Sequence, residues 1–206
     1  GHRFGFFPAV AVGYMISNEP WWEPVSNVIS LLKIKASYGK VGNDQIGGSR
    51  RFAYNTTINE NATGAAWGKT PATGTGYTTI GGITTDEEGN AFVEWEEATK
   101  SNVGIELGLF NDLTIQADLF RDYRDGIFLM RQSTPSAVGL QKDQYVNIGE
   151  MLNRGFDMSV VYDHTFSSGL SLSARGNFTF NRNRLIYDDQ PTPVEEYLSN
   201  VGFAYN

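Results

Sequence analysis

Alternation of apolar and polar residues over long runs is the feature that most limits how this chain can fold. The stretch NVGIELGLFNDLTIQADLF, residues 102–120, shows the alternation twice, on either side of Phe110-Asn111-Asp112. Side chains that alternate with period two lie on opposite faces of a β-strand, whereas an amphipathic helix repeats about every 3.6 residues. The pattern therefore predicts β-strands, and it raises the question of which face meets water.

Six runs of this kind occur along the chain, and helical periodicity is nearly absent. We expect strands at about residues 4–17, 31–41, 98–109, 113–128, 155–166 and 170–182. Residues 42–97 are rich in Gly, Thr and Asn and are expected to form one long loop, with room for short strands or one or two helical turns.

Short and long connections alternate along the chain. Residues 110–112 (FND) and 167–169 (SSG) contain Asn, Asp and Gly, which tolerate the positive φ of hairpin turns. A three-residue loop pairs Leu109 with Leu113 and keeps both apolar sets on one face, whereas a two-residue loop would separate them. Short links on one side of a sheet and long links on the other are typical of an up-and-down outer-membrane barrel.

Alternation alone does not separate a soluble β-sandwich, whose apolar face points inward, from a membrane barrel, whose apolar face meets lipid. The runs last about 11–14 residues, longer than the ~5–6 of globular strands and sufficient for the ~9–11 of a membrane strand. Aromatic residues lie at or near the run ends, as interfacial girdles require. They are Phe4, Phe6, Trp21, Trp22, Tyr38, Tyr162, Phe166 and Phe180.

The charges on the polar face also favour the barrel. Lys33, Lys35, Glu106, Asp118 and Arg175 would be costly facing lipid but ordinary facing a water-filled lumen. These observations favour an all-β, antiparallel transmembrane barrel wall, and a large soluble β-sandwich or solenoid remains the alternative.

Composition excludes several classes of function. The net charge is −7 and no basic stripe is present, so nucleic-acid binding is not expected. The chain has no cysteine, which excludes disulfides and thiolate metal sites, and its two histidines are far apart in sequence. No stretch approaches the ~20 apolar residues of a membrane helix. The chain starts without methionine or a signal-peptide layout, so we expect a fragment or a processed piece.

Candidate chemical sites are few. Glu106 and Asp118 share a face as diagonal neighbours ~7–8 Å apart, a spacing that suggests paired acids, but lumen lining is the better interpretation. We expect no catalytic, cofactor-binding or metal-binding residue, and we interpret His164 as an interfacial side chain. In the long loop, Tyr54, Trp67 and Tyr77 are candidate contacts for a substrate or a lid, unless they only pin the loop to its neighbours.

Five stretches carry a resemblance to a known family. They are RFGFFPAVAVGYMIS, LLKIKASYGKVGNDQIG, WEEATKSNVGIELGLFND, ADLFRDYRDGIFLMRQSTP and VNIGEMLNRGFDMSVVYD. In this order they resemble the C-terminal barrel of SusC/RagA-like TonB-dependent outer-membrane receptors, over about residues 3–184. The resemblance implies that this chain supplies about six strands of a wall of roughly 22 strands.

The resemblance also implies a function and partners. Members of the family are outer-membrane nutrient transporters that import glycans or peptides and are not enzymes. A plug domain and a TonB-box, both absent from this sequence, would fill the lumen and engage the TonB complex, and a SusD-like surface lipoprotein would cover the extracellular mouth. The alternatives are a passive porin-like channel and a soluble or surface β-sandwich adhesin.

Overall fold

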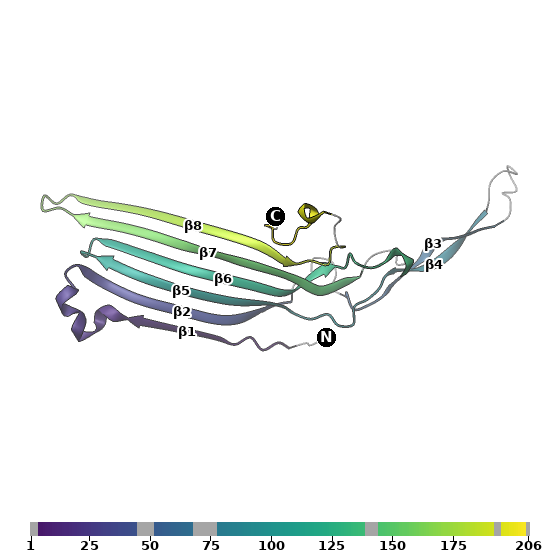
Figure 1. The fold of residues 1–206 in the computed structure, drawn as a ribbon, viewed down its shortest axis with the longest axis horizontal. Coiled ribbons are helices and arrows are strands. Elements are labelled where there is room, and N and C mark those ends of the chain that lie inside the picture. Colours follow the sequence, from purple (N-terminus) through teal and green to yellow (C-terminus); the bar gives the residue numbers. More distant parts are fainter. Residues whose placement is uncertain (1–3, 45–51, 68–77, 139–143, 192–194, 205–206) are drawn as a thin grey trace.

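The computed structural model describes residues 4–44, 52–67, 78–138, 144–191 and 195–204 (Figure 1). Its strands are β1 (Ala9–Met15), β2 (Ile29–Asn43), β3 (Thr57–Trp67), β4 (Thr78–Glu87), β5 (Glu96–Leu109), β6 (Leu113–Met130), β7 (Tyr145–Thr165) and β8 (Ser171–Tyr187). Short 3-10 helices are η1 (Ile16–Asn18), η2 (Pro20–Val25), η3 (Ser136–Val138) and η4 (Glu196–Leu198). Within these described ranges, no helix is long and apolar enough to cross a membrane.

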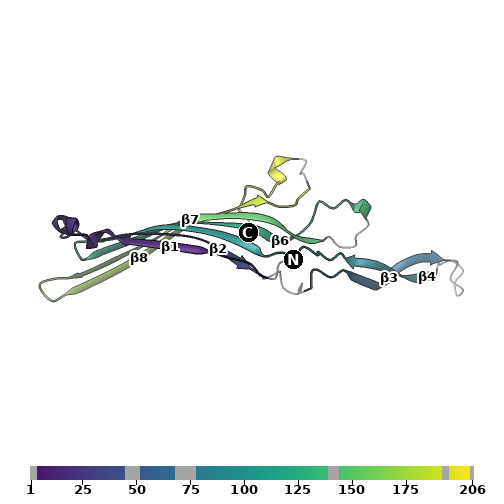
Figure 2. The ribbon, with the colours of Figure 1, turned by 90° about the horizontal axis from the view of Figure 1, so that it is seen from below.

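Six of the strands form one antiparallel sheet in the order β1-β2-β5-β6-β7-β8. Figures 1 and 2 show a long, bowed single layer with no second sheet packed on either face. Among the described residues, the only buried hydrophobic side chain is Leu185, which is 2 % exposed. A β-sandwich encloses a core between two packed sheets, so the sandwich alternative is wrong. The sheet is open, and β1 and β8 form its edges.

Each of the six predicted runs overlaps one strand of this sheet, but two strands differ clearly in where they begin. β1 starts at Ala9 and not near residue 4, because Pro8 has no N–H to continue the ladder. β7 starts at Tyr145, ten residues before the predicted start. Its first half carries polar side chains on both faces, such as Asn147, Asn153 and Arg154, so it lacks the alternation that reveals a strand.

Residues 42–97, expected as a long loop with room for short strands, contain two strands in their described part. β2 extends to Asn43, β5 begins at Glu96, and between them β3 and β4 pair as a separate antiparallel hairpin. Figures 1 and 2 show this hairpin projecting beyond one end of the main sheet. Its sequence is rich in Thr, Gly and Asn and its described side chains are mostly exposed, so backbone pairing holds the hairpin without an apolar face.

The predicted register of the β5–β6 hairpin is confirmed. Leu109 pairs with Leu113, and the N–H of Asp112 donates to the C=O of Leu109 across 3.1 Å. Phe110 and Asn111 have φ of 55° and 60°. The β7–β8 turn keeps the same spacing, since the N–H of Phe166 donates to the C=O of Leu170 across 2.8 Å. Both apolar sets therefore stay on one face.

The connections are sorted by length between the two ends of the sheet. Figure 1 shows the β5–β6 turn, the β7–β8 turn and the compact η1–η2 link at one end. The β3–β4 hairpin and the segment after β8 lie toward the other end. This is the asymmetry predicted from the sequence.

Candidate functional site

The two faces of the sheet differ in chemistry over its central part. One face, called here the apolar face, carries consecutive rows of cross-strand neighbours that are apolar or small. These rows are Leu32-Leu107-Ile115-Val160-Gly176, Ile34-Ile105-Ala117-Met158-Phe178 and Ala36-Val103-Leu119-Phe156-Phe180. The opposite face, called here the polar face, carries Lys33-Glu106-Gln116-Ser159-Asn177 and Lys35-Gly104-Asp118-Asp157-Thr179.

Charged side chains on the polar face form a connected network across three strands. Lys33 Nζ lies 3.3 Å from Glu106 Oε1, and Lys35 Nζ lies 3.6 Å from the same oxygen and 3.1 Å from Asp118 Oδ1. Gln116 Nε2 donates to Asp118 Oδ2 across 3.1 Å. All four charged side chains are partly exposed, which fits a surface in contact with water.

A glycine makes this network possible. Gly104 on β5 lies between Lys35 on β2 and Asp118 on β6. A Cβ at Gly104 would overlap the Asp118 carboxylate and the Lys35 side chain. Because Gly104 has no side chain, Lys35 can reach past β5 to Asp118 on β6.

The predicted positions of the two acids are confirmed, since Glu106 pairs with Gln116 and Asp118 with Gly104. Both carboxylates are bound by lysines, so the site is an ion-pair network on a wet surface. In the described part of the chain, no group of three or more histidine or acidic side chains is placed to hold a metal ion.

His164 holds a turn in place. Its Nδ1 lies 2.9 Å from Asp112 Oδ2, at the end of the β5–β6 turn, and its ring lies edge-on to Phe166 with centroids 4.5 Å apart. The sequence predicted that His164 is an interfacial side chain and did not reveal its contact with Asp112. The link to Asp112 depends on β6 pairing with β7, which brings the two residues together.

Two of the three candidate contact residues, Tyr54 and Trp67, have a described backbone on or beside the projecting hairpin. Tyr54 precedes β3, is 54 % exposed, and packs edge-on against Phe52 with centroids 6.1 Å apart. Trp67 is the last residue of β3, and its backbone pairs with Thr78. The side chain of Trp67 and the whole of Tyr77 lie outside the described residues.

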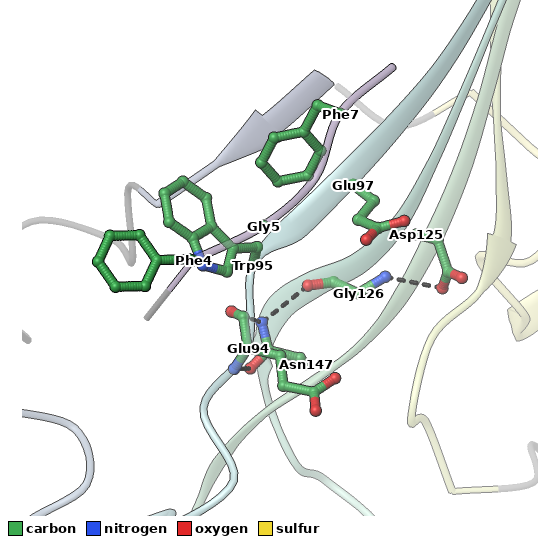
Figure 3. Close-up of a pocket in the computed structure, with 9 residues that line it drawn as sticks. All are labelled: Phe4, Gly5, Phe7, Glu94, Trp95, Glu97, Asp125, Gly126 and Asn147. Atoms are coloured by element: carbon green, nitrogen blue, oxygen red, sulfur yellow. Dashed lines mark hydrogen bonds between the residues drawn. The ribbon is translucent and has the colours of Figure 1, made fainter. Parts of the chain in front are cut away.

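A hollow that the sequence did not predict lies near the hairpin end of the sheet (Figure 3). Its volume is about 490 Å³, and its lining combines aromatic and acidic side chains. It is lined by Phe4, Gly5, Phe7, Glu94, Trp95, Glu97, Asp125, Gly126 and Asn147. Glu97 pairs with Asp125 two rows beyond Ser101 and Arg121, so the hollow continues the apolar face and does not open on the polar one.

Asn147 forms hydrogen bonds with two backbone segments that line this hollow. Its Nδ2 donates to the C=O of Glu94 and of Gly126, across 3.0 and 2.9 Å, and its Oδ1 accepts from the N–H of Glu94 across 3.0 Å. Gly126 has φ of 66°, a conformation that favours glycine. The Asn147 contacts join residues far apart in sequence, so no local signal could have revealed them.

A single bowed antiparallel sheet with one apolar and one charged face, and short turns at one end, is a section of a β-barrel wall. The chain matches the family described as TonB dependent receptor-like, beta-barrel, over residues 2–205. It therefore belongs to the TonB-dependent receptor β-barrel family, as the sequence resemblance indicated.

Relatives and solved structures agree with this assignment. The chain is 29 % identical to TonB-dependent receptor P39 of Formosa agariphila, over 89 % of this chain and 16 % of the relative. It is 27 % identical to TonB-dependent receptor SusC of Bacteroides thetaiotaomicron, over 89 % and 17 %. The RagAB peptide importer in its open-open state superposes with a TM-score of 0.69 at 26 % identity, over 90 % of this chain and 18 % of that chain. The chain thus spans about one sixth of the length of the curated relatives that it matches.

Proposed function

We propose that this chain is part of the wall of a TonB-dependent outer-membrane receptor that imports a nutrient. The observation that carries the proposal is the division of one curved sheet into an apolar face and a face with a lysine–carboxylate network. The apolar face meets lipid, and the polar face lines the lumen. The short turns point to the periplasm, and the β3–β4 hairpin points to the outside.

The chain supplies a passage and does no chemistry on the substrate. In the longer receptor, a plug domain outside this chain closes the lumen, and the TonB complex supplies the energy for import. The solved RagAB neighbour is named a peptide importer, which supports a peptide as the substrate, and a glycan is the other substrate that the family resemblance implies. The same resemblance implies a SusD-like lipoprotein as the lid.

The projecting hairpin is the part of the chain best placed to meet substrate or lid. It extends beyond the sheet at the end with long connections (Figure 1), and Tyr54 is exposed at its base. Aromatic rings stack on sugars and pack against peptides. We assign Tyr54, Trp67 and Tyr77 to this contact.

Import is tested in cells that carry the full-length receptor, with and without a functional TonB complex. We expect the receptor in the outer-membrane fraction and TonB-dependent uptake of either a labelled oligosaccharide or a labelled peptide mixture. Uptake that persists without TonB would show a passive channel, and recovery in the soluble fraction would contradict the proposal.

The contact residues are tested by Tyr54→Ala, with Phe92→Ala as the control, since Phe92 is another exposed aromatic beyond the hairpin. We expect Tyr54→Ala to weaken uptake or lid retention about fivefold or more, because one aromatic contact contributes ~1 kcal/mol. The control should leave both unchanged. Equal effects of the two variants would remove Tyr54 from the site.

A further inference from the structure

Three arginines stand side by side on the apolar face, one row beyond its last apolar residues. Arg121 on β6 pairs with Arg154 on β7, which pairs with Arg182 on β8. All three residues are exposed. Paired strands are ~4.8 Å apart, so the three positions span only about 10 Å.

The arginine row has no counter-charge in the part of the chain that the structure describes. None of its three guanidinium groups forms an ion pair there, whereas the lysines of the polar face meet carboxylates. Like charges directly opposite each other destabilise a ladder. A bound anion would offset this repulsion.

Acids farther along the same face are already engaged. Glu97 lies 2.7 Å from Lys40 Nζ, and Glu150 accepts from the hydroxyl of Tyr123 across 2.6 Å. The carboxylate of Asp125 accepts from the N–H of Gly126 across 2.7 Å. These three acids are therefore already bound, and none of them pairs with the arginine row in the part of the chain that the structure describes.

A groove of about 730 Å³ joins the arginine row to the apolar rows beside it. The three arginines line one part, and apolar side chains line the other, namely Val103, Leu119, Phe156 and Phe180. The rings of Phe156 and Phe180 lie 6.1 Å apart. A ligand that fits this groove has an anionic head and a hydrocarbon chain.

The height of the row on the sheet fits a lipid headgroup. His164 lies at the end of β7 that leads into the short β7–β8 turn, and Arg154 lies ten residues before it. At ~3.3 Å per residue and a strand tilt of ~40°, this corresponds to about 25 Å of height, the height of the apolar band of such barrels. With the short turns in the periplasm, the row lies in the headgroup region of the extracellular leaflet.

We propose that Arg121, Arg154 and Arg182 bind the phosphate of an anionic lipid of the extracellular leaflet, and that the groove beside them takes one of its acyl chains. Guanidinium groups bind phosphate oxygens through paired, charge-assisted hydrogen bonds. The proposal rests on the proposed function for the orientation of the sheet in the membrane.

The test is native mass spectrometry of the full-length receptor in non-ionic detergent. The probes are a phosphorylated glycolipid with several acyl chains (lipid A), the same lipid after removal of its phosphates, and inorganic phosphate. The variants are R121Q/R154Q/R182Q and the triple arginine-to-lysine replacement. Arg175→Gln is the control, because Arg175 lies on the polar face of β8.

We expect the wild type and the Arg175→Gln control to retain the phosphorylated lipid. The glutamine variant should lose affinity for the lipid by about tenfold per arginine. The lysine variant should lose less affinity, because it keeps the charge but lacks the planar guanidinium that forms paired hydrogen bonds. Equal binding of the dephosphorylated lipid, or of the phosphorylated lipid by the glutamine variant, would overturn the site. Inorganic phosphate that displaces the lipid at micromolar concentration would show a free-anion site and would also overturn it.

The two proposals fail separately. A wild-type receptor that imports its nutrient but shows no phosphate-dependent lipid binding would overturn the lipid site and leave import standing. A receptor that binds the phosphorylated lipid through these arginines but imports nothing would overturn the import function alone.

Discussion

Lys35 Nζ on β2 lies 3.1 Å from Asp118 Oδ1 on β6, although β5 runs between the two strands. The residue of β5 between them is Gly104, whose missing side chain leaves room for the contact. Lys35 also reaches Glu106 across 3.6 Å. One lysine thus links three strands on the face that we assign to the lumen.

We predict that Gly104→Ala and Gly176→Ala have different effects on stability. Both glycines lie inside strands, but nothing lies within 4 Å of a Cβ at Gly176. Gly176→Ala should raise the free energy of unfolding by ~0.5–1 kcal/mol, because glycine loses more backbone entropy on folding. At Gly104 the same gain is offset by loss of a partly exposed ion pair, which contributes up to about 1 kcal/mol. Urea unfolding of the full-length receptor in lipid measures both, and equal gains would contradict the role of Gly104.

Local rules predicted the hairpin registers from the sequence. A three-residue loop and a two-residue side-chain period are enough to pair Leu109 with Leu113, and with it Glu106 with Gln116. The same period showed which residues share the apolar face, because lipid on one side and water on the other impose alternation on every strand that crosses the membrane.

The features that the sequence did not predict lie where lipid and water do not impose alternation. The first half of β7 and the β3–β4 hairpin have polar residues on both faces, so their strands carry no alternation. The ion pairs of Lys33 and Lys35 and the arginine row depend on which strands are neighbours and in what register. Such contacts join residues as far apart in sequence as Lys35 and Asp118, so the pattern within a single strand does not reveal them.

The assignment of the two faces predicts opposite responses to a new charge. Ile105 lies on the apolar face, and Gln116 lies on the polar face of the neighbouring strand. Ile105→Arg should lower the free energy of unfolding by ~2–4 kcal/mol, the cost of an arginine near the middle of the bilayer. Gln116→Arg should cost less than about 1 kcal/mol because the side chain stays in water. Unfolding in lipid vesicles measures both, and a larger cost at Gln116 would reverse the orientation.

The β5–β6 turn contains a bulky residue in an unfavourable conformation. Phe110 has φ of 55°, a region that Asn tolerates and that β-branched residues avoid. Phe110→Asn and Phe110→Val both remove the exposed ring, so the difference between them isolates the backbone effect. We expect the Asn variant to be more stable than the Val variant by about 1–2 kcal/mol. Urea midpoints provide the comparison, and equal midpoints would show that the turn has another conformation.

Asp189 joins the segment after β8 to the segment after β6. This buried carboxylate accepts hydrogen bonds from the N–H groups of Gln132 and Ser133, across 3.2 and 3.3 Å, and from the Ser133 hydroxyl. Asp189→Ala removes the acceptor, so hydrogen exchange at these two amides should quicken at least tenfold, since a charged hydrogen bond contributes ~1.5–3 kcal/mol. Asp188→Ala is the control and should leave exchange there unchanged. Similar exchange in both variants would show that Asp189 does not hold this loop.

The open sheet predicts how the isolated chain of 206 residues behaves in water. β1 and β8 each have one neighbour in the sheet, and large apolar side chains such as Val103, Leu119 and Phe178 are more than half exposed. Unpaired strand edges recruit other strands, and large apolar patches associate. We therefore expect aggregates in detergent-free buffer, measured by size-exclusion chromatography with light scattering, and smaller species when detergent covers the apolar face. A sharp monomer peak without detergent would contradict the assignment of that face to lipid.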